Sequence, residues 1–246
     1  MPTRLHVFRV YRTALAILVR NAPIIVPTVI VATGIPAALE LLIEHELSKS
    51  VGALLTTVVD NFTTAFFAGA AEKLVYRWEQ GERHVGIRDA FSHVPAVVIP
   101  LFIVAFVQAL VIALGLVLLI VPGLIALTLF SVVGPALVAE NPGIRGAFRR
   151  SRQLVRGNAW PVFAVMFSLE LLAVLIAFAV SVIFSSIGET SDNPLALAIG
   201  ESVTLPLEVL VVAVMYWRLR SIEGRRLDQP EEGLAEAPAA DQATGD

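Results

Sequence analysis

Positive charge in this chain is confined to alternate gaps between its long apolar runs. Of the 18 Lys and Arg residues, all except Lys49 lie in the N-terminal segment, in the second gap or at the end of the run before it (Lys73), in the fourth gap or in the C-terminal segment. Short cytoplasmic loops of membrane proteins are enriched in Lys and Arg, and this bias orients each crossing. The distribution therefore predicts a multi-pass protein of the cell membrane with both its N- and C-termini in the cytoplasm.

The composition agrees with a membrane protein and limits the chemistry available to it. Hydrophobic residues make up 57% of the chain and charged residues only 16%, with a mean hydropathy of +0.78. A soluble domain has about 25% charged residues. The chain has no cysteine, which excludes disulfides, thiol chemistry and Cys-ligated zinc. Residues 221–246 are acidic and rich in Ala, Pro and Gly, so they are predicted to form a disordered cytoplasmic tail.

Six segments meet the test for a helix that crosses the hydrocarbon core, which takes about 20 apolar residues, but two meet it imperfectly: the second contains Asp60 and Asn61, and the fourth is short. The six segments span residues 22–43, 51–75, 94–120, 124–139, 160–187 and 194–217. The predicted fold class is all-α, with a six-span membrane domain over residues 22–220 and a cytoplasmic amphipathic segment, 1–21, before it. Val121-Pro122-Gly123 is expected to make the turn between the third and fourth spans, because Pro cannot continue a helix and Gly permits positive φ.

The fourth gap is predicted to be a basic amphipathic helix. Ile144, Ala147, Phe148, Ser151, Leu154 and Val155 recur at helical spacing on one face. Five arginines occupy the rest of the helix: Arg145, Arg149, Arg150, Arg152 and Arg156. Such a helix is expected to lie in the headgroup plane, with its apolar face in lipid and its arginines on anionic headgroups. It is either a lipid-sensing or partner-docking surface or an ordinary positive-inside anchor. Glu140 is expected to cap this helix or to pair with its arginines.

A similar sequence pattern precedes the other two pairs of predicted spans, the first with the second and the third with the fourth, each pair forming a transmembrane hairpin. Residues 86–91 (GIRDAF) echo residues 143–148 (GIRGAF), and residues 11–15 (YRTAL) are a looser copy. One interpretation is a unit of interfacial helix and transmembrane hairpin that is used three times. The three hairpins are then expected to superpose in the same orientation.

Residues 120–163 contain an ordered set of short motifs: an apolar Pro-Gly turn, a span that ends in Pro and an acid, and a basic helix that leads to an aromatic span start. These are Val121-Pro122-Gly123, Gly134-Pro135, Glu140-Asn141, Ala147-Phe148-Arg149-Arg150-Ser151, Leu154-Val155-Arg156-Gly157-Asn158 and Trp160-Pro161-Val162-Phe163. The set resembles the membrane domain found beside some glycerophosphoryl diester phosphodiesterases and in related small prokaryotic membrane proteins of unknown function. The resemblance implies a helical membrane module without an established activity of its own. The soluble phosphodiesterase domain is larger than any loop of this chain, so its activity is not carried over.

Four carboxylates within the predicted spans form a candidate intramembrane polar site: Asp60, Glu170, Glu201 and Glu208. Ionisable groups inside a membrane are costly, which makes each a functional hypothesis. Asp60, Glu170 and Glu208 are expected at similar depth, given a rise of about 1.5 Å per residue, and no Lys or Arg lies there. They form either a proton or cation pathway or a headgroup pocket, or they hydrogen-bond between helices as packing contacts. Glu72 is expected at the cytoplasmic interface.

The chain contains no recognisable catalytic motif. It has no phosphate-binding Gly-Lys loop and no HExxH, and its four histidines are scattered without ligand spacing. No catalytic residue, metal site or cofactor is therefore predicted, and nucleic-acid binding is not expected. The preferred interpretation is a non-enzymatic scaffold or envelope-organising module that contacts anionic lipids of the bilayer, and the sequence indicates no protein partner. The alternative is a small transporter or lipid-handling carrier that uses the midplane carboxylates.

Overall fold

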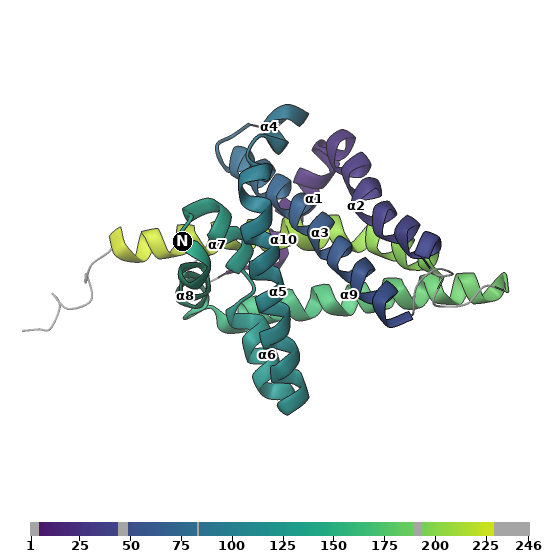
Figure 1. The fold of residues 1–246 in the computed structure, drawn as a ribbon. Helices are drawn as coiled ribbons and strands as arrows, with labels where there is room; N and C mark the ends of the chain where they lie inside the picture. Colours follow the sequence, from purple (N-terminus) through teal and green to yellow (C-terminus); the bar gives the residue numbers. More distant parts are fainter. Residues whose placement is uncertain (1–4, 44–48, 83, 189–192, 229–246) are drawn as a thin grey trace, which may run out of the picture.

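A computed structural model of the chain describes residues 5–43, 49–82, 84–188 and 193–228, and over these residues it is helical with no β-strand (Figure 1). The helices are α1 (Val7–Arg20), α2 (Ala22–Ile43), α3 (Lys49–Glu79), α4 (Ile87–Phe91), α5 (Val94–Leu118), α6 (Ile120–Leu129), α7 (Val133–Glu140), α8 (Gly143–Val155), α9 (Ala159–Ser186) and α10 (Pro194–Asp228). The predicted all-α fold class is confirmed.

Five helical stretches in the described part of the chain are long and apolar enough to cross a membrane. They are Ala22–Ile43, Val94–Leu118, Ile120–Glu140, Ala159–Ser186 and Pro194–Arg225. The chain is therefore a multi-pass helical membrane protein. The predicted second span is α3, which has 31 residues and carries Asp60 and Asn61 midway, and it is not among the five.

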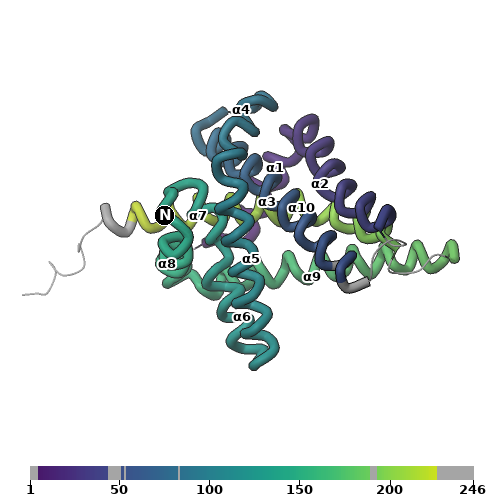
Figure 2. Tube along the Cα trace, viewed as in Figure 1, coloured from purple at the N-terminus to yellow at the C-terminus, as the bar shows by residue number. Residues whose placement is uncertain are grey.

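Three helical hairpins make up most of the molecule, and each follows a shorter helix. α1 precedes the α2–α3 hairpin, α4 precedes α5–α6, and α8 precedes α9–α10. The α2–α3 and α9–α10 hairpins extend toward the same side of the molecule, whereas α5–α6 projects in a different direction (Figures 1 and 2). This order matches the predicted unit of helix and hairpin. The direction of α5–α6 departs from the expected common orientation, and the superposition of the individual hairpins stays a prediction.

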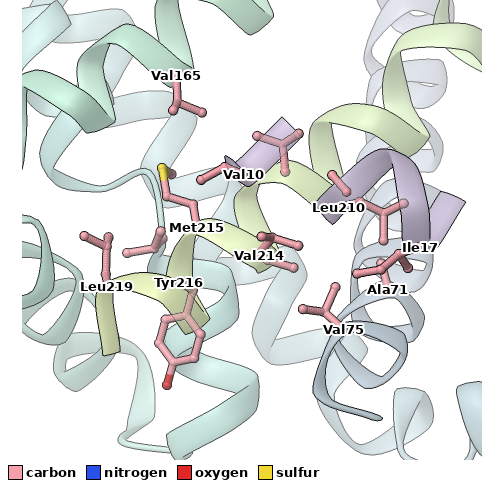
Figure 3. Close-up of a cluster of buried hydrophobic side chains, with 14 of the residues drawn as sticks. Val10, Ile17, Ala71, Val75, Val165, Leu210, Val214, Met215, Tyr216 and Leu219 are labelled. Carbon is pink, nitrogen blue, oxygen red and sulfur yellow. The ribbon is translucent and has the colours of Figure 1, made fainter. Parts of the chain in front are cut away.

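The main core forms where α1, α3 and α9 pack around α10 (Figure 3). Val10 and Ile17 of α1 are fully buried there, and so are Val75 of α3 and Val214 of α10. The Tyr11 hydroxyl also lies 2.6 Å from Ser168 Oγ of α9. The apolar face of the N-terminal amphipathic helix is thus buried in the protein itself, because a core of neighbouring helices covers it.

The turn between α5 and α6 lies earlier than the Pro-Gly sequence predicts. Leu119 is the only residue between the two helices and has an extended backbone (φ −160°, ψ 137°). Pro122 and Gly123 fall in the first turn of α6, where a missing N–H is tolerated. A Cβ on Gly115 would lie 2.8 Å from Gly123 Cα, so the two glycines serve close helix packing rather than a positive φ.

The predicted fourth span, 124–139, is not one continuous helix. It breaks at residues 130–132, between α6 and α7. Pro135 lies in the first turn of α7 and has no N–H to donate to residue 131, which favours the break. Ser151 of α8 satisfies the freed backbone groups: its Oγ donates to the Leu129 carbonyl at 2.8 Å and accepts from the Val132 N–H at 3.3 Å.

The last helix is longer than predicted. α10 continues through Asp228, so residues 221–228 are helical rather than the start of the disordered tail predicted from 221. Glu223 in this extension pairs with Arg150 of α8, which gives the extra two turns a tertiary contact. The rest of the predicted tail, residues 229–246, lies outside the described residues.

Candidate functional site

The predicted basic helix exists as α8, but its apolar face does not contact lipid. Ala147, Ser151 and Val155 are fully buried and Leu154 is 4% exposed; these side chains pack against α7, α6 and α10. A helix whose apolar side is covered by protein has a fixed position. The expected immersion of this face in the bilayer is therefore corrected by the structure.

The five arginines of α8 differ in their surroundings. Arg145, Arg149, Arg152 and Arg156 are exposed, and in the described part of the chain no carboxylate pairs with any of the four. Arg150 points into the molecule instead. The sequence pattern does not distinguish the five arginines. The packing of α8 shows that Arg150 alone is partly buried.

Arg150 joins α7, α8 and α10 through two carboxylates. Its Nε donates to Glu140 Oε2 at 2.7 Å, and its Nη1 and Nη2 donate to the two Glu223 oxygens at 2.8 and 2.6 Å. The Tyr216 hydroxyl donates to Glu140 Oε1 at 2.9 Å. The hydrogen bonds that Arg150 donates to Glu223 and to Glu140 raise the pKa of its guanidinium. The expected pairing of Glu140 with the following arginines is confirmed.

Large apolar side chains also stand exposed beside arginines at three places on two other short helices, α1 and α4. Phe8 is 76% exposed beside Arg9, Val19 is 71% exposed beside Arg20, and Ile87 is 61% exposed beside Arg88. Trp160, at the start of α9, is 81% exposed. Apolar and aromatic side chains next to cations are typical of a membrane–water interface.

The four candidate carboxylates do not share one cavity. Asp60 of α3 and Glu201 of α10 line an outer cavity of about 170 Å³, together with Glu40 of α2. Glu40 lies inside the predicted first span and was not among the predicted site residues. A carboxylate within an apolar span was the signal that could have identified it.

Glu208 lines a second, central cavity of about 190 Å³ between α3, α5, α7 and α10. Asn61, Gln108 and Glu72 also line this cavity. Glu208 interacts electrostatically with Glu170 and Glu201, although Glu170 is exposed on α9 and lines neither cavity. No three His, Asp or Glu side chains in the described part of the chain are placed to hold a metal ion.

A third cavity, of about 390 Å³, is also lined by Glu72. Its walls come from α3, α7, α10 and the residue before α5: Glu72, Lys73, Tyr76, His93, Val138, Ala139, Trp217 and Arg220. Glu72 is only 5% exposed and lines both this basic cavity and the central one. Its deep burial differs from the interfacial position that its neighbour Lys73 suggests, because α10 covers it.

Comparison of the chain with protein-family models, with curated proteins and with solved structures found no match.

Proposed function

We propose that this chain is a non-enzymatic membrane module that crosses the bilayer six times and presents a rigid basic face to anionic lipid headgroups in the cytoplasm-facing leaflet. It acts as a scaffold that gathers such lipids in the cell envelope. The observation that carries the proposal is the surface of α8, where one side is buried in the core and four arginines stand exposed on the other.

The energetics favour lipid contact at this surface. Each Lys or Arg near an anionic membrane surface contributes about 1 kcal/mol, and the attraction falls off within a Debye length. One short helix holds the four exposed arginines, and in the described chain no carboxylate forms an ion pair with any of them: Arg145, Arg149, Arg152 and Arg156. Because the core fixes α8, little conformational entropy is lost when headgroups bind. The exposed Trp160 next to this surface suits the same interface.

The threading that brings the basic helices together requires α3 as the sixth crossing. Its 31 residues extend over about 45 Å, enough for a hydrocarbon core of about 30 Å. The polar residues that interrupt it face cavities, since Asp60 lines the outer cavity and Asn61 the central one. Six crossings put α1, α4, α8 and the end of α10 on one side, where the arginines gather, and both termini in the cytoplasm.

A carrier that uses the midplane carboxylates has less support. Such a carrier should gather Asp60, Glu170 and Glu208 around one hydrated cavity, whereas Asp60 and Glu208 line different cavities and Glu170 lines neither. The resemblance to the membrane domain found beside glycerophosphoryl diester phosphodiesterases stays a prediction and carries no part of this proposal.

The proposal is tested by replacing the four exposed α8 arginines with Gln in the full chain. Wild-type protein in nanodiscs of mixed phosphatidylglycerol and phosphatidylcholine should concentrate the anionic lipid around itself, and added salt should weaken the effect. The quadruple variant should lose most of this enrichment, measured by quenching from brominated phosphatidylglycerol.

The matched control replaces the same four residues with Lys, which keeps the charge while changing the hydrogen-bonding geometry. This variant should retain most of the enrichment, because the attraction to a lipid surface is largely a matter of charge. Equal enrichment in the Gln variant and the wild type would sink the proposal.

A further inference from the structure

Unpartnered polar atoms gather in the basic cavity defined above. Among the described residues, Glu72 Oε1, His93 Nδ1 and Trp217 Nε1 are buried and make no hydrogen bond of good geometry, although the Trp217 side chain lies close enough to interact with the Glu72 carboxylate. All three residues line this cavity. A buried polar group without a partner is destabilising. Native proteins rarely leave such groups unsatisfied unless a water, ion or ligand completes them. Three at one cavity indicate a site that is completed by something it binds.

The two cations of this cavity are only weakly paired within the protein. Lys73 Nζ lies 4.0 Å from the nearest Asp89 oxygen, and Arg220 Nε lies 3.9 Å from Glu140 Oε1. Both distances are beyond hydrogen-bonding range. Arg220 stacks over the Trp217 ring at 5.2 Å, which holds its side chain at the cavity wall. The wall thus offers ammonium, guanidinium and indole donors to an incoming group.

This donor set fits a phosphate. Phosphate oxygens accept several charge-assisted hydrogen bonds at once, and Arg and Lys are the side chains that most often supply them. Glu72 Oε1 adds an acceptor for a hydroxyl or ammonium group carried by the same ligand. Beyond Glu72 the central cavity is lined largely by apolar side chains, among them Leu101, Val104 and Val209, which suit a hydrocarbon chain.

We propose that the basic cavity binds the phosphate group of a single amphiphile between Lys73 and Arg220, with a headgroup donor on Glu72 and hydrocarbon in the central cavity. This site is separate from the exposed α8 arginines, and only its assignment to the cytoplasm-facing leaflet rests on the threading proposed above. The site binds one specific lipid molecule, in addition to the loosely held anionic lipids that gather at the exposed α8 arginines.

The test uses delipidated full-length protein in non-ionic detergent and native mass spectrometry to count bound molecules. Three probes separate the sources of the chemistry: dioleoyl phosphatidylglycerol, dioleoylglycerol and inorganic phosphate. One phosphatidylglycerol should bind per chain, and dioleoylglycerol should bind at least about tenfold more weakly, as expected for the loss of charge-assisted hydrogen bonds. Inorganic phosphate should compete with the lipid at high concentration.

Variants assign the binding to the cavity. Lys73→Ala and Arg220→Ala should each weaken phosphatidylglycerol binding about tenfold, while Lys73→Arg should retain it. The quadruple α8 Gln variant should keep this one stoichiometric lipid, and the two alanine variants should keep the salt-sensitive lipid enrichment, so the two proposals fail separately. Unchanged elution and melting temperature without lipid exclude misfolding as the cause.

Three outcomes would overturn the inference. Dioleoylglycerol could bind as tightly as phosphatidylglycerol, which would show that the cavity does not recognise the phosphate group. The alanine variants could leave affinity unchanged, which would place the lipid elsewhere. Inorganic phosphate could bind as tightly as the lipid, which would retain the phosphate contacts but exclude the proposed hydrocarbon path.

Discussion

At the scale of single residues, Arg150 shows how much one side chain of a charged helix can differ from its neighbours. Its guanidinium makes paired hydrogen bonds to Glu223 and further ones to Glu140, and its side chain is 20% exposed. Such planar, bidentate pairing is specific to Arg. The cluster ties the last turns of α10 to α7 and to α8, the helix that carries the exposed arginines.

Replacing Arg150 with Met should destabilise the protein, because it leaves two partly buried carboxylates facing each other. Removing one partner of a fully buried ion pair costs about 3–5 kcal/mol; partial exposure here reduces the expected loss to about 1–3 kcal/mol. Arg149→Met, one position away at an exposed site, should change stability by less than about 0.5 kcal/mol. Denaturant unfolding in detergent measures both, and equal effects would show that the cluster contributes nothing.

A second ion pair makes the stability sensitive to acid. Arg77 Nη2 lies 2.9 Å from Asp89 Oδ2 and ties α4 to α3, and this hydrogen bond lowers the pKa of the Asp89 carboxyl below its usual 3.8. Because the folded pKa is depressed, the stabilisation is complete above the unfolded pKa and disappears as pH falls through the folded one. The wild type should therefore exceed Asp89→Asn in melting temperature by a constant margin above about pH 5, and the margin should shrink below about pH 4.

Glu79→Gln is the control for this titration. Glu79 is exposed at the end of α3, and no ion pair in the described chain involves it. The melting temperatures of Glu79→Gln and the wild type should differ little, because no ion pair is lost. A margin for Asp89→Asn that stays flat down to pH 3 would argue that the Arg77 contact adds no stability.

The candidate residues were predictable in type but not in grouping. Carboxylates in apolar segments stand out in a sequence, so Asp60, Glu201 and Glu208 could be found. Whether they meet depends on the rotation of each helix about its axis, which an apolar span does not reveal, and packing placed Asp60 and Glu208 in different cavities. The burial of Glu72 depends on α10, some 140 residues away in the sequence.

At the scale of elements, the hairpin of α5 and α6 relies on backbone contact. A Cβ on Gly123 would lie 2.5 Å from Leu116 Cγ and 2.7 Å from its backbone nitrogen. A flexible side chain could move aside, but the backbone atom cannot do so without opening the hairpin. Membrane helices commonly use small residues for such close approach, since lipid supplies no hydrophobic drive for packing.

Gly123→Ala should therefore destabilise the protein by about 1–3 kcal/mol, the usual cost of overpacking. Gly34→Ala is the matched control, because a Cβ at that helical position would meet nothing within 4 Å and Ala favours helix by up to about 1 kcal/mol. Unfolding of both variants in the same detergent gives the comparison. If Gly123→Ala proves no less stable than Gly34→Ala, close contact does not hold the hairpin together.

Helix positions follow from the sequence where apolar length decides them and fail where a tertiary contact does. The predicted ends of the spans agree with α2 and α9 within one residue. The break between α6 and α7 was missed because the apolar length of residues 124–139 decided the prediction, although Gly134-Pro135 lies just after the break. It is stabilised by Ser151, a residue about 20 positions later whose hydroxyl looked like an ordinary member of an amphipathic face.

At the scale of the whole molecule, each short helix ties its hairpin to a shared core around α10. α1, α2, α3 and α9 all pack directly on α10, while the outer parts of α5 and α9 expose side chains such as Val117, Leu118 and Phe178 that suit lipid tails. The interfacial helices then have fixed places relative to the membrane, because protein packing rather than lipid affinity positions them. Whether they all lie on one side depends on α3.

Single-cysteine variants can decide whether α3 crosses, since the natural chain has no cysteine. Leu42→Cys and Ser186→Cys lie at the tips of the α2–α3 and α9–α10 hairpins, whereas Glu79→Cys and Arg149→Cys lie after α3 and on α8. With six crossings, a membrane-impermeant thiol reagent should label the first two on intact cells and the last two only after permeabilisation. If α3 does not cross, positions 42 and 79 must react from the same side. That result would place α1 across the membrane from α4 and α8, and the basic helices could no longer form a single lipid-binding face.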